Sequence, residues 1–211
     1  KIIDTSDAWI REHIGVRTRA VIDPAETIAA MGVEAAREAV EKSERRDIRL
    51  VICATNSPDM LYPATACRIA HELQLGLVPA YDLQAGCTGF LYALAQAKAV
   101  VESQNVSVLV IGSDAISTGF LWKGDPGARM RGVDAGHEVH RSGDRNAVLF
   151  GDGAGAVVLS PSVQPGILAI HTGADYSDAI SLATPSSPAL NSPLHYLAGE
   201  SERRPGDYYT K

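Results

Sequence analysis

The sequence predicts an α/β protein with a mixed, mostly parallel sheet that is covered by helices in α-β-α layers. Segments with apolar residues at helical spacing alternate along the chain with short apolar runs of strand length, which is the pattern of strands joined by helices. Several of these short runs are continuously apolar, as in parallel strands that are buried on both faces. A late strand–turn–strand pattern indicates an antiparallel hairpin at one edge of the sheet, so the sheet is expected to be mixed.

Four helices are expected from the spacing of apolar residues and from their start signals. Thr5 or Ser6 can cap the first helix, Pro24 fits the first turn of the second, and Pro63 opens the third. The expected helices span residues 7–13, 25–42, 63–73 and 88–103. The expected strands span residues 49–55, 79–83, 106–111, 147–150, 154–159 and 167–171.

Composition and charge argue against several classes of function. The chain has 211 residues, a formal net charge of −6 and a pI of about 5.5, which disfavours nucleic acid or an anionic membrane as the main partner. No apolar run approaches the roughly 20 residues that span a bilayer, and the first residues lack the pattern of a secretory signal. Three cysteines without metal-ligand spacing favour a reducing, cytoplasmic location and no metal site.

Cys87 is the strongest candidate for chemistry. It lies in AGCTGF (residues 85–90), between a strand-like run and a helix-like run. This position places its sulfur near a helix N-terminus, where the helix dipole favours the reactive thiolate. The flanking glycines allow a sharp turn and the close approach of a substrate. The alternative is a buried structural cysteine, which is the role that we expect for Cys53 and Cys67.

A second motif, GDGAG at residues 151–155, lies between two strand-like runs. It lacks the Lys-Ser/Thr pair of a phosphate-binding loop, and we interpret it as a tight hairpin whose glycines adopt positive φ angles. His137 and His140 have no ligand cluster around them and are assigned to an exposed loop. His171 is expected to end a strand as a structural histidine.

The segment around Cys87 also differs by one residue from the G-x-nucleophile-x-G turn of hydrolases. A cysteine hydrolase is therefore an alternative, and it would need an acid and a histidine later in the chain. Asp178 and His195 stand in that order.

Two regions depart from the α/β pattern. Residues 122–142 are rich in glycine and basic residues and are expected to form a long surface loop or lid. From residue 181 onward the chain is rich in Ser, Pro and Ala and loses its periodicity. We therefore divide the chain into a domain of residues 1–180, which carries the cysteine, and an irregular connector of residues 181–211.

Taken together, these features resemble the 3-oxoacyl-ACP synthase III group of the thiolase-like superfamily. The cysteine motif and the glycine motif occur in the family's order, and the resemblance covers nearly the whole chain. The matching segments are residues 4–10 (DTSDAWI), 15–17 (GVR), 85–90 (AGCTGF), 112–114 (GSD) and 149–156 (LFGDGAGA). The resemblance implies a thiolase-like fold.

The resemblance implies that Cys87 accepts an acyl group from acyl-CoA, and that its main-chain N–H forms half of an oxyanion hole. The acyl group then condenses with a malonyl group on an acyl carrier protein, with loss of carbon dioxide, to initiate fatty acid or polyketide synthesis. Acyl-CoA is a substrate in this scheme, so no cofactor is implied. A homodimer is implied by the family alone.

Five further residues acquire roles from the same resemblance. Trp9 matches the tryptophan that stacks on the adenine of CoA, although the core anchor of a short helix is the other interpretation of this residue. Arg17 and Arg145 match arginines at the same entrance. Tyr62 matches an aromatic residue that lines the acyl pocket across the dimer interface, and Phe150 matches a phenylalanine beside the cysteine.

The chain also departs from the family pattern. His13 stands where the family often has arginine, and the 122–142 loop is longer than in simple fatty-acid members, so O- or N-acyl transfer in specialised metabolism is an alternative. The histidine and asparagine that support condensation in the family lie beyond residue 211, and His195 is not that histidine. We therefore expect that the chain is the N-terminal half of a longer protein. The 211 residues alone are expected to be acylated at Cys87 but not to catalyse the condensation. A non-catalytic thiolase-like partner subunit is the remaining alternative.

Overall fold

The computed structural model describes residues 5–119 and 148–175. The chain divides into two compact units, residues 1–170 and 171–211. Every helix and strand described below belongs to the first unit. The predicted boundary after residue 180 lies outside the described residues and stays a prediction.

The described part of the first unit contains helices and strands at nearly all the predicted places. The helices are α1 (Asp7–His13), α2 (Ile28–Ser43), α3 (Thr65–Glu72) and α4 (Gly89–Gln104). The strands are β1 (Ile48–Ala54), β2 (Ala80–Leu83), β3 (Ser107–Asp114) and β4 (Gly153–Leu159). Short 3₁₀ turns cover Gly86–Thr88 and Ile116–Gly119. The four predicted helices are confirmed, each within three residues of its expected bounds.

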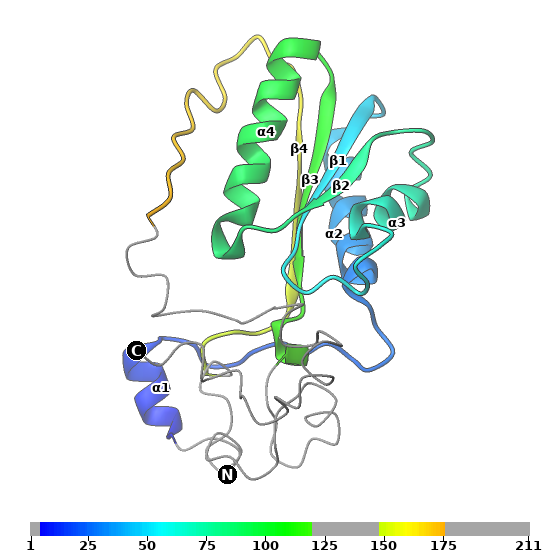
Figure 1. Ribbon diagram of the computed structural model, residues 1–211. Coiled ribbons are helices and arrows are strands. Elements are labelled where there is room, and N and C mark those ends of the chain that lie inside the picture. The colour runs from blue at the N-terminus through cyan, green and yellow to red at the C-terminus, as the bar shows by residue number, and fades with distance from the viewer. Residues whose placement is uncertain (1–4, 120–147, 176–211) are drawn as a thin grey trace, which may run out of the picture. The chain divides into compact units, whose positions relative to one another are not determined.

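The four strands form one sheet in the order β2-β1-β3-β4. The pairs β1–β2 and β1–β3 are parallel, whereas β4 runs antiparallel to β3 (Figure 1). Cys53 on the central β1 is in register with Asp82 of β2 and Ile111 of β3. The prediction of a mixed, mostly parallel sheet is therefore confirmed.

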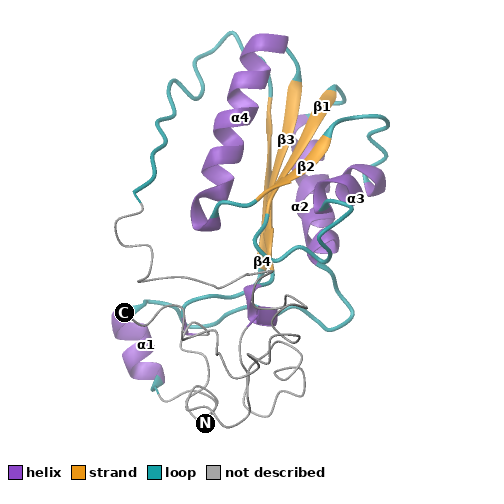
Figure 2. Cartoon of the chain, viewed as in Figure 1, coloured by secondary structure: helices purple, strands orange, loops and turns teal. Residues whose placement is uncertain are grey.

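Helices cover both faces of this sheet, as Figure 2 shows for α4 on one side and α2 and α3 on the other. Successive side chains of a strand point to opposite faces, and β1 follows this rule. Val51 and Cys53 belong to the cluster that packs against α2 and α3, while Ile52 and Ala54 belong to the cluster under α4. Burial on both faces explains the continuously apolar strands of the sequence.

Two of the described helices, α1 and α2, begin where a local side chain caps them. Ser6 accepts a hydrogen bond from the N–H of Trp9 at 3.2 Å, and Thr27 accepts one from the N–H of Ala30 at 3.1 Å. These side chains satisfy main-chain donors that a helix start leaves unpaired. The cap at Thr27 explains why α2 begins three residues later than predicted.

The predicted strand over residues 147–150 is wrong, because the part of it that the structure describes forms a turn. This segment is tied to a distant part of the chain instead of to a strand. The side chain of Arg19 donates to the carbonyl of Val148, and the N–H of Asp152 donates to the carbonyl of Ala20 at 2.9 Å. β4 therefore reaches β3 without forming a hairpin.

The predicted strand over residues 167–171 is also wrong. Within the described residues this segment has no partner strand, and Ile167 and Leu168 are 44% and 81% exposed. An apolar run becomes a strand only where a neighbour completes its main-chain hydrogen bonds. His171 is exposed, so its predicted structural role is not supported.

Two further predictions need correction. The glycines of residues 151–155 do not adopt positive φ angles. Gly151 is instead required by space, because a Cβ there would lie 2.9 Å from Cβ of Arg19 and 3.0 Å from the carbonyl oxygen of Ala20. Cys53 is buried as predicted, but Cys67 is exposed on α3, and its thiol donates to the carbonyl of Ala80 at 3.4 Å.

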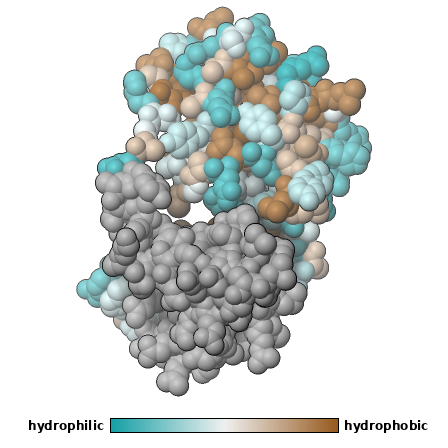
Figure 3. All heavy atoms as spheres, viewed as in Figure 1, coloured by the Kyte–Doolittle hydropathy of each residue, from teal (hydrophilic) through white to brown (hydrophobic). Residues whose placement is uncertain are grey.

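The surface of the described residues is mixed in character. Figure 3 shows polar and apolar residues interspersed over one face. Among the helices of the described ranges, none is both long enough and apolar enough to cross a membrane.

Candidate functional site

Cys87 lies in the 3₁₀ turn that joins β2 to α4, and its side chain is exposed. The turn closes through the N–H of Gly89, which donates to the carbonyl of Gly86, and through the hydroxyl of Thr88, which donates to the carbonyl of Ala85 at 2.8 Å. Gly86 has a φ of +57°, a left-handed conformation that glycine adopts without strain. The predicted position of the cysteine at a helix start is therefore confirmed.

A polar network lies beside this turn, at the carboxyl ends of β1 and β3. The last residue of β3, Asp114, accepts hydrogen bonds from three consecutive residues that follow β1. Its Oδ1 accepts from the hydroxyl of Thr55 at 3.1 Å, the N–H of Asn56 at 2.6 Å and the hydroxyl of Ser57 at 2.9 Å. Its Oδ2 accepts from the side-chain amide of Asn56 at 2.9 Å. One carboxylate thus fixes the first three residues of the loop after β1.

Two further carboxylates cap helices at the same edge of the sheet. Asp59 accepts from the N–H groups of Ile28 and Ala29 at 2.8 and 3.0 Å, at the start of α2. Asp82 of β2 accepts from the N–H groups of Thr65 and Ala66 at 2.7 and 2.8 Å, at the start of α3. The starts of α2, α3 and α4 therefore meet the carboxyl ends of the parallel strands, which is where open α/β sheets bind their ligands.

The buried thiol of Cys53 lies beneath this edge and is chemically different from Cys87. Burial raises the pKa of Cys53 strongly, and the nearby carboxylates of Asp82 and Asp114 raise it further. A thiol whose pKa is raised in this way stays protonated and unreactive near neutral pH. The structure thus separates an inert core thiol from the exposed one at the turn.

Trp9 lies in α1 and is 46% exposed. Its ring stacks on the ring of His13, with ring centroids 4.5 Å apart and an interplanar angle of 12°. His13 Nδ1 also lies 3.0 Å from the carbonyl oxygen of Trp9. No residue of α1 is buried, so the interpretation of Trp9 as a core anchor is wrong. Arg17, in the segment that follows α1, is exposed.

The remaining site candidates are distributed over other segments. Tyr62 lies in the loop between β1 and α3 and is 83% exposed, and Phe150 is half-buried just before the glycine motif. Arg145 lies outside the described residues, as do the histidines of the 122–142 loop and the acid and histidine proposed for a hydrolase. The roles of Trp9, Arg17, Arg145, Tyr62 and Phe150 stay predictions.

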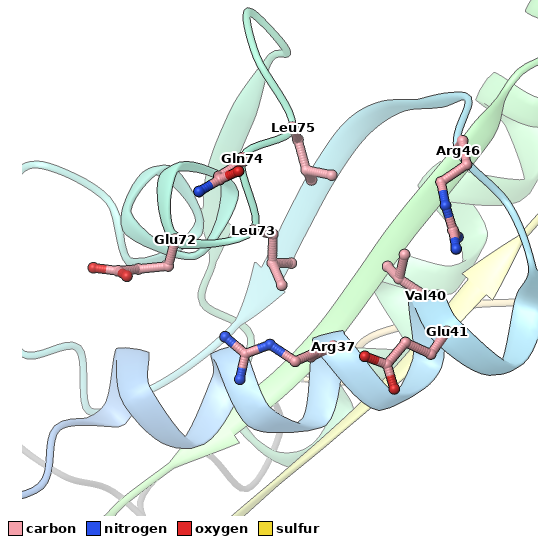
Figure 4. Close-up of a pocket in the computed structure, with 8 residues that line it drawn as sticks. All are labelled: Arg37, Val40, Glu41, Arg46, Glu72, Leu73, Gln74 and Leu75. Atoms are coloured by element: carbon pink, nitrogen blue, oxygen red, sulfur yellow. The ribbon is translucent and has the colours of Figure 1, made fainter.

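The described residues contain no group of three or more His, Cys, Asp or Glu side chains that could hold a metal ion. A hollow of about 200 Å³ does exist between the ends of α2 and α3, lined by Arg37, Val40, Glu41, Arg46, Glu72, Leu73, Gln74 and Leu75 (Figure 4). It lies at the last turns of these helices, whereas Cys87 lies at the edge where the helices start. Its position at the opposite ends of these helices separates this hollow from the cysteine site.

The polar network around Asp114 was not predicted from the sequence. A signal was available, since Thr55, Asn56 and Ser57 directly follow one buried strand and Asp114 ends another. The carboxyl ends of neighbouring parallel strands meet at one edge of a sheet, which places such side chains together.

Comparison with known proteins identifies relatives of this chain in sequence and in fold. Residues 81–176 match the family model of 3-oxoacyl-[acyl-carrier-protein (ACP)] synthase III. Beta-ketoacyl-[acyl-carrier-protein] synthase III of Yersinia enterocolitica is 37% identical, over 96% of this chain and 60% of that protein.

Two solved structures share the fold. The structure of 3-oxoacyl-[acyl-carrier-protein] synthase III from Aquifex aeolicus matches with a TM-score of 0.63 and 36% identity, over 77% of this chain and 47% of that one. The priming beta-ketosynthase of the R1128 polyketide pathway matches with a TM-score of 0.63 and 34% identity, over 78% and 44%. The chain thus spans about half the length of the proteins that it matches. The mixed, mostly parallel sheet agrees with these matches, and the chain belongs to the 3-oxoacyl-[acyl-carrier-protein] synthase III family of thiolase-like proteins.

Proposed function

We propose that Cys87 is the nucleophile of an acyltransferase, and that it takes its acyl group from the thioester of an acyl-CoA. The observation that carries this proposal is the exposed thiol in a glycine-flanked turn at the start of α4. Main-chain N–H groups at a helix start stabilise negative charge, both on a thiolate and on the oxyanion of an attacked carbonyl. Membership in the family supports the same role.

The first step is a thioester exchange. The Cys87 thiolate attacks the carbonyl carbon of the acyl-CoA, the bond between that carbon and the Cys87 sulfur forms, and the bond to the CoA sulfur breaks. CoA leaves as a thiolate and takes up a proton. The main-chain N–H of Cys87 donates to the carbonyl oxygen while that oxygen carries negative charge.

The second step, which we propose for the whole protein, is decarboxylative condensation with a malonyl group on an acyl carrier protein. The malonyl carboxylate leaves as carbon dioxide, and the electron pair of the broken bond attacks the acyl carbon on Cys87. A carbon–carbon bond forms, the bond to the Cys87 sulfur breaks, and the thiol is restored. Splitting the reaction into two steps is the usual advantage of covalent catalysis.

The other parts of the proposal concern binding. Trp9, exposed on α1 with its ring stacked on that of His13, would stack on the adenine of CoA, and Arg17 and Arg145 would contact its phosphates. Tyr62 and Phe150 would line the acyl chain. Acyl-CoA is a substrate in this scheme and CoA a product, and two copies of the chain would associate so that Tyr62 reaches the partner's pocket.

The intact mass of the purified protein tests the nucleophile. The wild-type chain is incubated with a panel of acyl-CoA thioesters, and we expect a single acyl adduct. The adduct should disappear in Cys87→Ala and persist in Cys67→Ser, because Cys67 is also exposed and controls for nonspecific thiol acylation. The proposal would be refuted if the adduct survives in Cys87→Ala. It would also be refuted if none of the thioesters gives an adduct with the wild-type chain.

A further inference from the structure

We infer that Asn56 is a positioning residue for Cys87: its carboxamide, fixed by Asp114, holds the turn that presents the cysteine. The inference deepens the proposed function and rests on it for its consequence in acyl transfer. The hydrogen bonds of Asn56 within the described residues go to Asp114 and to the main chain of Gly86, so its effect on Cys87 passes through the main chain of the turn.

Asn56 is held at two points by the same carboxylate. Its N–H donates to Oδ1 of Asp114 at 2.6 Å, and its Nδ2 donates to Oδ2 of Asp114 at 2.9 Å. Hydrogen bonds to a charged acceptor are stronger than neutral ones. Because main chain and side chain are both fixed, the carboxamide has little freedom to rotate.

The same Nδ2 reaches the cysteine turn. It lies 3.4 Å from the carbonyl oxygen of Gly86, the residue before Cys87. Both neighbours of Nδ2, Asp114 Oδ2 and Gly86 O, are hydrogen-bond acceptors. Only the NH₂ end of the amide can donate to both, so the contacts themselves assign the orientation of the amide.

The carbonyl of Gly86 belongs to the peptide group that also contains the N–H of Cys87. In a planar trans peptide, the C=O and N–H bonds point in opposite directions. A donor that holds the Gly86 oxygen therefore also sets the direction of the Cys87 N–H. This N–H is the group that we propose for the oxyanion hole.

The conformation of Gly86 explains why a hydrogen bond to its carbonyl oxygen helps to fix the turn. Its φ of +57° is open to glycine, but a glycine is also the least restricted residue in the chain. The N–H of Gly89 already donates to the Gly86 oxygen from the helix side. Asn56 adds a second donor from the loop after β1, so the peptide plane is fixed from two sides.

Ser57 provides a matched control. Its hydroxyl donates to the same Asp114 Oδ1 at 2.9 Å and accepts from the N–H of Ala115 at 2.8 Å. It belongs to the same loop, and within the described residues its hydrogen bonds go to Thr55, Asp114 and Ala115 and not to Gly86 or Cys87. Ser57→Ala therefore disturbs the loop and the carboxylate without releasing the turn.

The test uses the full chain in a Cys67→Ser background, in which Cys87 is the only exposed thiol. Asn56→Ala and Ser57→Ala are compared in two reactions of Cys87: acylation by acyl-CoA and alkylation by iodoacetamide. Acylation develops an oxyanion, whereas alkylation does not. We expect Asn56→Ala to lower the maximal acylation rate about tenfold, with the half-saturating acyl-CoA concentration unchanged and a smaller effect on alkylation. Ser57→Ala should leave the ratio of the two rates unchanged.

A second readout does not depend on acyl chemistry. Labelling with ¹⁵N-cysteine gives amide signals for Cys53 and Cys87 in the same background. We expect Asn56→Ala to shift the Cys87 signal and to leave the buried Cys53 as an internal reference, while Ser57→Ala shifts neither. Asn56→Ser replaces Asn56→Ala if the latter does not fold, since serine can still donate to Asp114 but is too short for Gly86.

The possible outcomes separate the two proposals. A Cys87 signal and an acylation rate that are both unchanged in Asn56→Ala overturn the inference while the proposed function stands. Equal losses of acylation and alkylation, or the same loss in Ser57→Ala, also overturn it. A wild-type chain that no thioester acylates, but whose Cys87 signal moves only in Asn56→Ala, refutes the proposed function and supports the positioning role.

Discussion

Phe90, in the first turn of α4, packs its ring directly against Gly112 of β3. A Cβ added at Gly112 would lie 3.2 Å from Cδ2 of the Phe90 ring. Phe90 follows Cys87 by three residues, so this contact fixes the position of the first turn of α4 relative to β3, directly after the cysteine turn. Glycine is thus favoured at position 112 because a side chain there would crowd Phe90, and not because of the main-chain conformation, since the φ of Gly112 is not in the left-handed region.

Gly112→Ala should therefore destabilise the fold by overpacking. Phe90 must shift by a few tenths of an ångström, and overpacked cores typically lose about 1–3 kcal/mol. Urea unfolding measures this loss. Gly166→Ala is the control, because a Cβ there meets nothing within 4 Å. Adding Phe90→Leu to Gly112→Ala should recover part of the loss, and equal midpoints for Gly112→Ala and Gly166→Ala would contradict the packing argument.

Asp82→Ala should uncap α3. The helix has no capping side chain of its own, since Ala64 occupies its N-cap position, and both oxygens of Asp82 accept main-chain N–H groups there. Loss of a capping side chain costs about 1–2 kcal/mol, which thermal or urea unfolding can measure. Ala64→Asp, at an extended N-cap with a ψ of 146°, should restore much of the loss in the double variant. Failure of this rescue would show that Asp82 acts in another way.

Cys53 should resist thiol reagents in the folded protein. Burial, followed by the charges of Asp82 and Asp114, raises the pKa of its thiol, so it stays protonated at a pH of about 8, where ordinary thiols begin to ionise. A disulfide exchange reagent should titrate two thiols in the native chain, Cys67 and Cys87, and a third after denaturation. Three equally fast thiols in the native protein would contradict the burial of Cys53.

Trp9→Ala should weaken CoA binding and leave stability nearly unchanged. α1 has no buried residue, and Trp9 is 46% exposed, so little packing is lost. Stacking of a base on an aromatic side chain contributes about 1–3 kcal/mol. Calorimetric titration with CoA measures the affinity, and His13→Ala, which removes the stacked partner but leaves the indole ring, is the comparison. Unchanged affinity in Trp9→Ala would exclude the adenine role.

Local patterns predicted the elements of this fold well. The helix at Asp7–His13 was predictable from Ser6 and the apolar spacing, and the turn at Cys87 was predictable from its two glycines. The strand predicted over residues 147–150 failed because its contacts are with Arg19 and Ala20, far away in the chain. No local pattern reports such a pairing.

The same limit applies to the site. The position of Cys87 follows from its neighbours in the sequence, but the carboxylate that supports its turn comes from the end of another strand. Asn56 and Asp114 meet only because β1 and β3 are parallel neighbours. Grouping the polar residues that follow each buried strand would have placed both residues at one edge of the sheet, but the strand order that brings them together is not in the sequence pattern.

β3 is the strand at which pairing changes from parallel to antiparallel, because it pairs in parallel with β1 on one side and antiparallel with β4 on the other. β4 is made only after residues 115–152 have been synthesised. During that interval on the ribosome, the outer hydrogen-bonding edge of Val108, Leu109, Val110 and Ile111 has no partner from β4, and an unpaired apolar edge is a template for aggregation. Until β4 pairs with it, this edge of β3 is thus an aggregation-prone segment of the nascent chain.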